Sequence, residues 1–182
     1  ASRNRYGLSE YRVLMFPGAP RPYKGVEDVL MAIDLLDESD LRLAIVGGSP
    51  YDDYDVKLKD KWGRWIIELP SSPPQMMPEI VAAADVVVVP QRDHPATRAQ
   101  FPLKLTDGMA MAKPVLATRV GDIPEILGDT GYLVDPSSPE QLATQIQSIF
   151  KHLDEAKDRG IQARARCVKH YGIDAMSEIL SE

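Results

Sequence analysis

Hydrophobic residues along this chain fall into two alternating patterns. The first consists of short apolar runs, rich in valine, leucine and isoleucine and closed by glycine, proline or polar residues. Such runs are typical of strands that are buried on both faces of a sheet. They predict strands at Arg12–Phe16, Leu41–Val46, Trp65–Leu69, Val86–Val89, Val115–Thr118 and Tyr132–Val134.

The second pattern places apolar residues three and four positions apart, as in an amphipathic helix. Val26–Leu36 shows it, with Val26, Val29, Leu30, Ile33 and Leu36 on one face. Ser138 and Pro139 open another such segment with a capping serine and a first-turn proline. The helices predicted in addition to Val26–Leu36 are Asp53–Trp62, Met77–Ala84, a short helix within Phe101–Ala110, Ser138 to about Leu153, Ala156–Tyr171 and Asp174–Leu180.

Strands that alternate with helices predict the α/β class and a doubly wound parallel sheet with helices on both faces. Ligands of such sheets bind beyond the carboxyl ends of the strands, where the strand order reverses. The loops that follow strands at this edge are therefore the candidate binding loops. They are Pro17–Lys24, Gly47–Asp52, Pro70–Met76 and Pro90–Pro102.

Composition narrows the class of protein. The chain has 182 residues, enough for one domain with a real core, and a net charge of −6 argues against a dedicated nucleic-acid binder. A single cysteine, Cys167, suits a reducing compartment, and with only three histidines we expect no metal site. We expect a cytoplasmic protein without a membrane span or a signal peptide. Because Ala1 stands where an initiator methionine would be, we expect a fragment of a longer protein.

The loop after the first strand carries two cations. Gly18 relaxes the backbone, while Arg21 and Lys24 stand just before a helix. This combination suits a diphosphate, although an ordinary solvated loop with two exposed cations has the same appearance. Gly47, after the second strand, would line the floor of the same cleft or simply turn the chain.

The segment from Phe101 to Ala110 leads from a polar loop into a helix. The backbone N–H groups at such a helix start attract anions. Lys104 adds a cation, and Asp107, one turn further on, is placed to accept hydrogen bonds from a ribose diol. Alternatively, Asp107 only complements the helix dipole. His94, in the preceding loop, either contacts a sugar hydroxyl or is a plain surface residue.

Several motifs in this order resemble the C-terminal, donor-binding half of the GT-B glycosyltransferases, in particular the retaining family 4, or glycosyl transferases group 1. The similarity covers roughly residues 10 to 150. The matching motifs are Gly18 through Lys24-Gly25, Ala82–Val86, Pro102–Ala110, Lys113-Pro114-Val115, Gly121–Ile126 and Gly131–Val134. Each is weak alone, but their order and spacing are specific.

The resemblance assigns roles to matching residues. Lys24, with Arg21, would act as the catalytic cations on the donor diphosphate, and Asp107 would hold the ribose hydroxyls. The backbone around Pro102, Leu103 and Lys104 would hold the distal phosphate and the sugar. The remaining donor-binding residues implied are Gly18, Gly47, Phe101, Leu105 packed on the nucleoside, and Leu69 with Pro70 and Ser71 around the base.

The chain departs from the family pattern at three positions. Ala19 stands where an arginine is usual, and Ala99 and Asp107 stand where the family has two glutamates. Ala112 replaces a usual glycine. Losing the first glutamate removes a contact to the donor sugar, so the nucleotide part of the site is better preserved than the sugar part.

The resemblance implies a Rossmann-like domain that forms one half of a GT-B fold. We expect a linker at residues 1–11, the nucleotide-sugar-binding domain at 12–153, and C-terminal helices at 154–182 that pack toward a missing N-terminal domain. Helices there that are merely solvated are equally compatible with the pattern.

The expected function is binding of a UDP- or GDP-sugar donor for a retaining transfer to an acceptor, with no metal and no cofactor. The domain would be inactive alone, and any contact with the inner face of a membrane would be made by the absent half. The alternatives are a degenerate scaffold domain, favoured by Ala19 and Ala99, and half of a nucleotide-sugar epimerase. A receiver-like signalling domain is disfavoured because Phe16-Pro17-Gly18 stands where that fold needs an acidic cluster.

Overall fold

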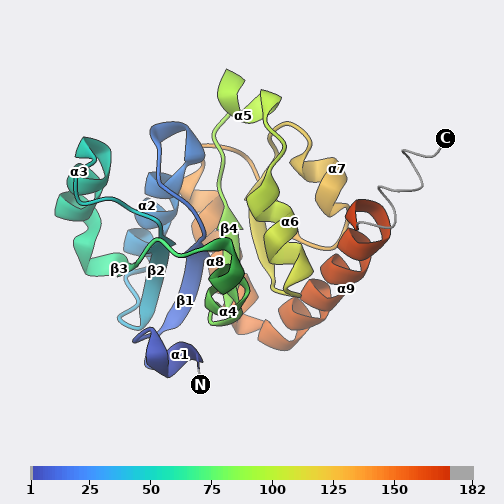
Figure 1. Ribbon diagram of the computed structural model, residues 1–182, viewed down its shortest axis with the longest axis horizontal. Helices are drawn as coiled ribbons and strands as arrows, with labels where there is room; N and C mark the ends of the chain where they lie inside the picture. The colour runs from blue at the N-terminus through green and yellow to red at the C-terminus, as the bar shows by residue number, and fades with distance from the viewer. Residues whose placement is uncertain (1, 173–182) are drawn as a thin grey trace.

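Six parallel strands form the central sheet of the computed structural model, which describes residues 2–172 (Figure 1). Their order is β3-β2-β1-β4-β5-β6, and every neighbouring pair is parallel. The doubly wound α/β sheet predicted from the sequence is therefore confirmed. The strands are β1 (Arg12–Phe16), β2 (Leu41–Val46), β3 (Ile66–Leu69), β4 (Val86–Val89), β5 (Val115–Thr118) and β6 (Tyr132–Val134).

The strands are mostly apolar because helices cover both faces of the sheet, and the charged exceptions, Arg12, Arg42 and Glu68, are not buried. Val13 and Met15 pack into one hydrophobic cluster, whereas Leu14 and Phe16, which point the other way, pack into a second. The first cluster includes residues of α4, α6, α7 and α9, and the second includes residues of α2, α3 and α8. The core is thus a three-layer arrangement of helix, sheet and helix.

The helices largely follow the predicted segments. Asp52 caps α3, since its side chain accepts hydrogen bonds from the backbone N–H groups of Tyr54 and Asp55, and Ser138 caps α8 through Gln141. The bounds are α1 (Ser2–Arg5), α2 (Val26–Leu36), α3 (Asp53–Trp62), α4 (Met77–Ala82), α5 (Pro95–Ala99), α6 (Leu103–Ala110), α7 (Ile123–Leu127), α8 (Pro139–Lys151) and α9 (Leu153–Tyr171), with 3₁₀ turns at Pro22–Lys24, Gly63–Trp65 and Pro74–Met76.

Some predicted boundaries were wrong. Trp65 belongs to a 3₁₀ turn before β3, where its buried indole donates to the carboxylate of Asp34 at 2.9 Å. Helix α4 ends at Ala82, two residues early, and α8 and α9 meet at His152, which adopts a non-helical backbone. The apolar periodicity that defined these segments does not mark such local breaks.

The polar segment Pro90–Gln100 is not a loop throughout, because α5 lies within it. The Nδ1 atom of His94 accepts a hydrogen bond from the Ala96 N–H, and the Thr97 hydroxyl accepts one from the His94 N–H. This capping box stabilises a helix too short to show a periodic pattern. His94 also stacks on Tyr23, with ring centroids 5.2 Å apart. The helix α7 was likewise not predicted.

Both ends of the described part of the chain, residues 2–172, pack against the domain. Residues 1–11 were predicted to form a linker, but Leu8 is fully buried and Arg3 donates to the carbonyl of Ala83 at 3.0 Å. At the other end, α9 packs along α6, and Figure 1 shows it crossing the same side of the sheet. The predicted helix Asp174–Leu180 lies outside the described residues. Within residues 2–172, no helix has the length and hydrophobicity needed to cross a bilayer.

The strand order reverses between β1 and β4, which are adjacent in the sheet although far apart in the sequence. Their carboxyl ends lead into the segments that begin at Pro17 and Pro90. The candidate loops identified from the sequence therefore meet at this crevice, the usual ligand position in such sheets.

Candidate functional site

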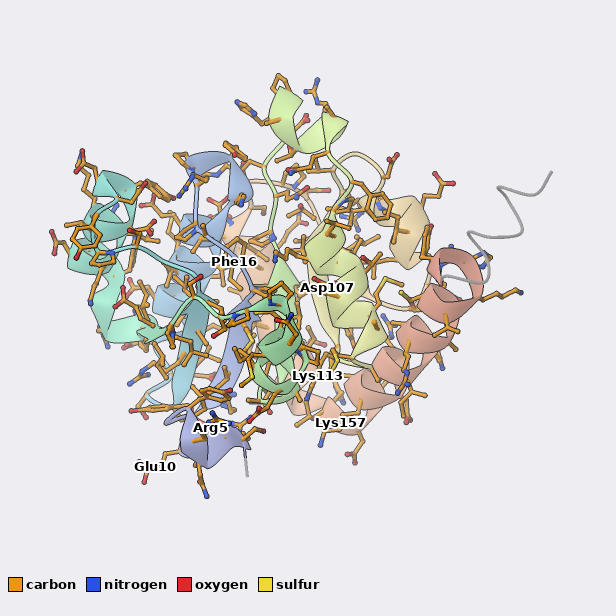
Figure 2. All side chains as sticks on the ribbon, viewed as in Figure 1. Arg5, Glu10, Phe16, Asp107, Lys113 and Lys157 are labelled. Atoms are coloured by element: carbon orange, nitrogen blue, oxygen red, sulfur yellow. The ribbon has the colours of Figure 1, made fainter. Side chains whose placement is uncertain are left out.

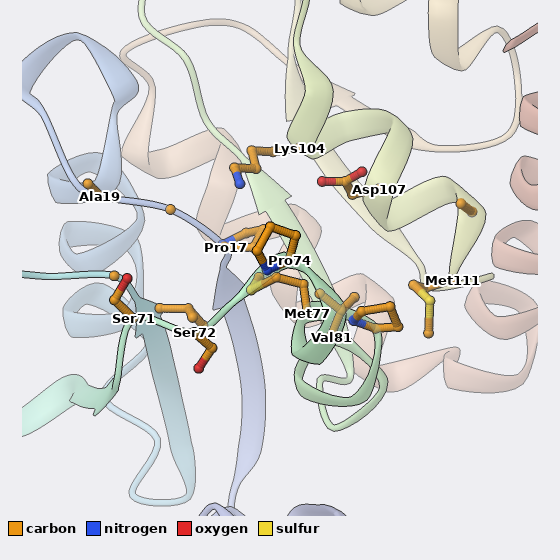
Figure 3. A pocket seen from close by; sticks show the side chains of 15 residues that line it. Pro17, Ala19, Ser71, Ser72, Pro74, Met77, Val81, Lys104, Asp107 and Met111 are labelled. Carbon is orange, nitrogen blue, oxygen red and sulfur yellow. The ribbon is translucent and has the colours of Figure 1, made fainter.

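Two adjoining cavities open at the carboxyl edge of the sheet. The larger has a volume of about 480 Å³ and the smaller about 140 Å³, and both are lined by Gly18 and Lys104. Figure 3 shows the larger one, with Lys104 and Asp107 on α6 facing Ala19, Ser71 and Ser72 across the opening. The two cavities share Gly18 and Lys104 as wall residues and together make up the candidate site between the loop after β1 and α6.

Helix α6 is seated close to the sheet, which fixes its polar side chains at the crevice. A Cβ atom on Gly108 would lie only 3.1 Å from a methyl carbon of Val87, so glycine permits this approach. Leu105 and Met109 are fully buried beneath the helix. The opposite face therefore presents Lys104 and Asp107, three residues apart, to the larger cavity. Figure 2 places Asp107 near the middle of the molecule.

Lys24 lies at the smaller cavity in a crowded cationic environment. Its Nζ atom donates to the carbonyl of Ala19 at 3.1 Å. Burial lowers the pKa of Lys24, and the positive charges of Arg21 and Lys104 lower it further. Like charges that converge on one half-buried point favour an anionic ligand, which would relieve their repulsion.

Arg21 lies at the rim of the crevice. It lines neither cavity, and its guanidinium donates to the carbonyl of Pro20 at 2.6 Å and faces Asp52 at 3.8 Å. A half-exposed pair at this distance is weak and can exchange for another anion. Arg21 therefore contributes positive potential to the site without a direct place in either wall.

Asp107 provides an acceptor in the larger cavity. Desolvation raises the pKa of Asp107, and the ammonium group of Lys104 partly opposes this shift. Among the described residues that line this cavity, Asp107 is the one carboxylate. A partly desolvated carboxylate beside a lysine is suited to accept hydrogen bonds from vicinal hydroxyls.

The other predicted residues divide between the walls and the core. Gly47 lines the larger cavity, and Phe101, Pro102 and Leu103 line the smaller one. Leu69 is buried at the end of β3, and Pro70 is exposed beside Ser71 without lining a cavity. Leu105, expected to pack on a nucleoside, instead belongs to the core, because its side chain points from α6 toward the sheet.

Most of one wall of the larger cavity was not predicted from the sequence, although Pro74 lies in the candidate loop Pro70–Met76. This wall is largely apolar and is formed by Pro74, Met77, Pro78, Val81, Ala110 and Met111. Met77 and Val81 lie one turn apart on α4, and the sequence pattern predicted only that this segment is helical. The spacing of Asp107 and Met111, also one helical turn, was the available signal that Met111 shares the face of the acid.

Acidic and histidine side chains do not gather at this site. Within residues 2–172, no group of three or more His, Cys, Asp or Glu side chains is arranged to hold a metal ion. The charged groups that the structure does bring to the crevice are Lys24, Lys104 and Asp107, with Arg21 at the rim.

These features define an α/β domain of the Rossmann-like type, with a cationic crevice at its topological switch point. Residues 11–152 match the family model of the glycosyl transferases group 1, and the chain belongs to this family. The resemblance identified from the sequence motifs is therefore confirmed.

Individual proteins agree with this assignment. The chain is 30% identical over 168 residues to the N-acetyl-alpha-D-glucosaminyl L-malate synthase of Bacillus anthracis, covering 90% of this chain and 42% of that protein. It is also 30% identical over 171 residues to a D-inositol 3-phosphate glycosyltransferase of Corynebacterium glutamicum, covering 87% of this chain and 40% of that one. The chain thus spans about two fifths of the length of these curated relatives.

Among solved structures, HepE of Anabaena in complex with UDP-glucose shares this fold, with a TM-score of 0.80 and 18% identity over 99% of this chain and 51% of HepE. The C-terminal domain of a group 1 glycosyl transferase from Francisella tularensis gives a TM-score of 0.77 with 22% identity, covering 95% of this chain and 94% of that domain. The fold is therefore that of one half of a GT-B glycosyltransferase.

Proposed function

We propose that this chain is the nucleotide-sugar-binding domain of a retaining glycosyltransferase, which transfers a sugar from a nucleoside diphosphate donor to an acceptor. The observation that carries the proposal is the convergence of Lys24 and Lys104, with Arg21 at the rim, on a crevice that also presents Asp107. The family assignment supports sugar transfer, and the UDP-glucose complex of HepE supports a donor of this class.

The proposed pose follows the chemistry of the walls. The ribose hydroxyls donate to Asp107, and the base lies in the larger cavity between Ser71 and the apolar wall at Met77. The diphosphate lies where the two cavities meet, next to Gly18, with Lys24 and Lys104 on either side. The sugar then extends along the smaller cavity.

Lys24 is the proposed catalytic cation, and Arg21, at the rim, is proposed to add positive potential to it. Negative charge grows on the diphosphate as the bond to the anomeric carbon breaks, so fixed cations stabilise the transition state more than the ground state. Because these ammonium and guanidinium groups supply the positive charge, we propose that the transfer needs no metal. Retention of the anomeric configuration is proposed on the family resemblance.

The catalytic unit requires a second, acceptor-binding domain in this proposal. The described chain contains one sheet, whereas its curated relatives are more than twice as long. We therefore expect donor binding but no transfer by residues 1–182 alone. Sugar transfer at an enzyme-like rate by this chain without a partner would contradict this division of labour. We also propose a cytoplasmic location, for which the single cysteine is the support.

The test of the proposed function is a calorimetric titration of the chain with UDP, GDP and ADP at low ionic strength. We expect one of them to bind with a stoichiometry of one, and the affinity to fall as salt is added, since the contact is partly ionic. Failure of all three to bind would contradict the proposal and would favour a degenerate scaffold domain, consistent with Ala19 and Ala99.

The pKa of Lys24 predicts how binding depends on pH. Only the protonated ammonium pairs with a diphosphate, and the pKa of Lys24 is lowered by burial and by its cationic neighbours. The affinity for a nucleoside diphosphate should therefore begin to fall at a lower alkaline pH than for an ordinary lysine. Titrations across this range should show a flatter profile for Lys24→Arg, because a guanidinium stays charged. Identical profiles for the two proteins would contradict the role of Lys24.

Replacing Asp107 should have opposite effects on binding and on stability. The pKa of Asp107 is raised by desolvation, so its charged form opposes folding, and the cost is present above the folded-state pKa and absent in acid. Asp107→Asn should therefore raise the melting temperature of the free domain at neutral pH but not near pH 3. The same variant should weaken nucleotide binding about tenfold, because a charged acceptor is lost.

Thermal melts at both pH values and calorimetry measure these effects. Asp60→Asn, at an exposed position on α3, is the matched control and should change neither quantity appreciably. A lower melting temperature of Asp107→Asn at neutral pH would show that the carboxylate stabilises the free fold instead.

A further inference from the structure

The segment that leaves β4 is in direct contact with the segment that carries Lys24. The backbone N–H of Arg92 donates to the carbonyl of Tyr23 at 2.9 Å. Gly25 lies so close to this segment that a Cβ atom on it would be 1.8 Å from the carbonyl oxygen of Pro90. The segment that follows β4 therefore forms a hydrogen bond with one neighbour of Lys24 and lies close against the other.

The side chain of Arg92 adds a third contact on the far side of Lys24. Its Nε and Nη2 atoms donate to the two carboxylate oxygens of Asp28 at 2.9 and 2.8 Å. The Asp28 side chain is 7% exposed and that of Arg92 34%. Asp28 lies in the first turn of α2, and its N–H donates to the carbonyl of Gly25 at 3.1 Å. A bidentate pair in such a place has a fixed geometry.

The backbone around Arg92 is also held in place, so both partners of the Arg92–Asp28 ion pair are fixed. Its carbonyl accepts a hydrogen bond from the hydroxyl of Thr97 at 2.6 Å, and the carbonyl of Gln91 accepts one from Thr118 at 2.6 Å. Arg92 lines neither cavity, whereas Gln91 lines the smaller one. Arg92 thus contacts the backbone segments around the site but not the cavities in which a ligand would lie.

Lys24 lies in surroundings that disfavour its charge, so its backbone must be held at the crevice. Its ammonium group is partly desolvated and lies near Arg21 and Lys104, conditions that disfavour the charge and lower the pKa of Lys24. A shift of the backbone would carry the ammonium group away from the crevice and relieve this cost. The contacts between Tyr23 and Asp28 oppose such a shift and keep the Cα atom of Lys24 within reach of the crevice.

We propose that Arg92 is a positioning residue for the donor diphosphate, because its ion pair with Asp28 and its bond to Tyr23 hold Lys24 over the crevice. This inference rests on the proposed function, since it assigns how the diphosphate part of that site is kept ready for its ligand. The proposed base and ribose contacts, at Ser71 and Asp107, lie in the larger cavity and do not depend on the Arg92–Asp28 ion pair.

The test compares a nucleoside diphosphate with its nucleoside, for example UDP with uridine, by calorimetry. Arg92→Lys keeps the charge but removes the two-pronged contact. We expect it to weaken UDP binding about tenfold, the size of effect that a small displacement of a binding group produces, and to leave uridine binding unchanged. Arg119→Lys is the matched control, because Arg119 forms an exposed pair with Asp135 at 2.9 Å just after β5 and β6 and lines neither cavity.

A double variant shows whether Arg92 acts through Lys24. In a Lys24→Ala background, Arg92→Lys should cost less than about twofold in UDP affinity, because the group it positions is gone. Should Arg92→Lys fail to fold, Asp28→Asn combined with Arg92→Gln removes both charges together and should give the same selective loss.

The outcomes separate this inference from the proposed function. Equal weakening of UDP and uridine, or losses that multiply in the Lys24→Ala background, would show a general structural role and would overturn the positioning inference alone. Failure of the parent chain to bind UDP, GDP or ADP would instead overturn the proposed function, and the positioning inference with it.

Discussion

Replacing Lys24 with alanine should weaken the binding of a nucleoside diphosphate about 10- to 100-fold, as expected when a charge-assisted hydrogen bond is lost. The ammonium group is partly buried beside the crevice, and the pKa of Lys24 is lowered by desolvation and by Arg21 and Lys104. An anion that neutralises this group gains more than it would from an exposed lysine. Calorimetry with the nucleotide that binds the parent chain measures the loss.

The free domain should not be destabilised by the same change. A cation that is disfavoured in the folded state costs stability, so Lys24→Ala should melt at the same or a higher temperature than the parent chain. Lys59→Ala is the matched control, because Lys59 lies on α3 in an exposed pair with Glu68 and should not affect binding. Unchanged nucleotide affinity in Lys24→Ala would contradict the assignment of the diphosphate to this residue.

Replacing Gly25 with alanine should produce the largest loss of stability, about 2–4 kcal/mol in the free energy of unfolding. Gly25 has φ +75°, a conformation that alanine adopts only at a cost, and its Cβ atom would lie 1.8 Å from the carbonyl oxygen of Pro90. Either α2 or the segment after β4 must then move. Thermal denaturation should show a decrease of roughly 5–15 °C for a domain of this size.

Gly7 provides a control for the conformational part of this effect. It has φ +70°, and a Cβ atom added there would meet no heavy atom within 4 Å, so Gly7→Ala should cost only about 1 kcal/mol. The difference between the two variants measures the close approach of Pro90 to Gly25. Equal melting temperatures for the two would show that the contact with Pro90 relaxes without cost.

The sheet was predictable from the sequence because its strands are buried on both faces. A run such as Val86–Val89 is apolar at every position, and all four side chains are buried, on alternate sides. Strands buried on both faces indicate a parallel sheet, and parallel strands bring their carboxyl ends, and so the loops that follow them, to one edge. Lys24, Lys104 and Asp107 were therefore expected near each other, and the structure brings them to two adjoining cavities.

The local details depend on contacts that a single sequence does not display. Helix α5 exists because His94 and Thr97 cap it, and five residues are too few for a hydrophobic period. The family resemblance predicted that Leu105 contacts the ligand. Because Gly108 lets α6 pack close to the sheet, the side chain of Leu105 instead lies in the core. The apolar wall at Met77 was not predicted because a sequence pattern does not distinguish an apolar side chain in the core from one that lines a cavity.

The most direct test of the proposed donor site is an NMR titration of the ¹⁵N-labelled chain with UDP, GDP and ADP. For one of these nucleotides we predict saturable shifts of the backbone amides of Gly18, Gly47, Ser71 and Lys104, which surround the two cavities. In Lys24→Ala these shifts should need about 10 to 100 times more nucleotide to saturate, and the spectrum of the free chain should be otherwise unchanged. Shifts that gather elsewhere, or a spectrum that none of the three nucleotides changes, would contradict a nucleotide-sugar site at this crevice.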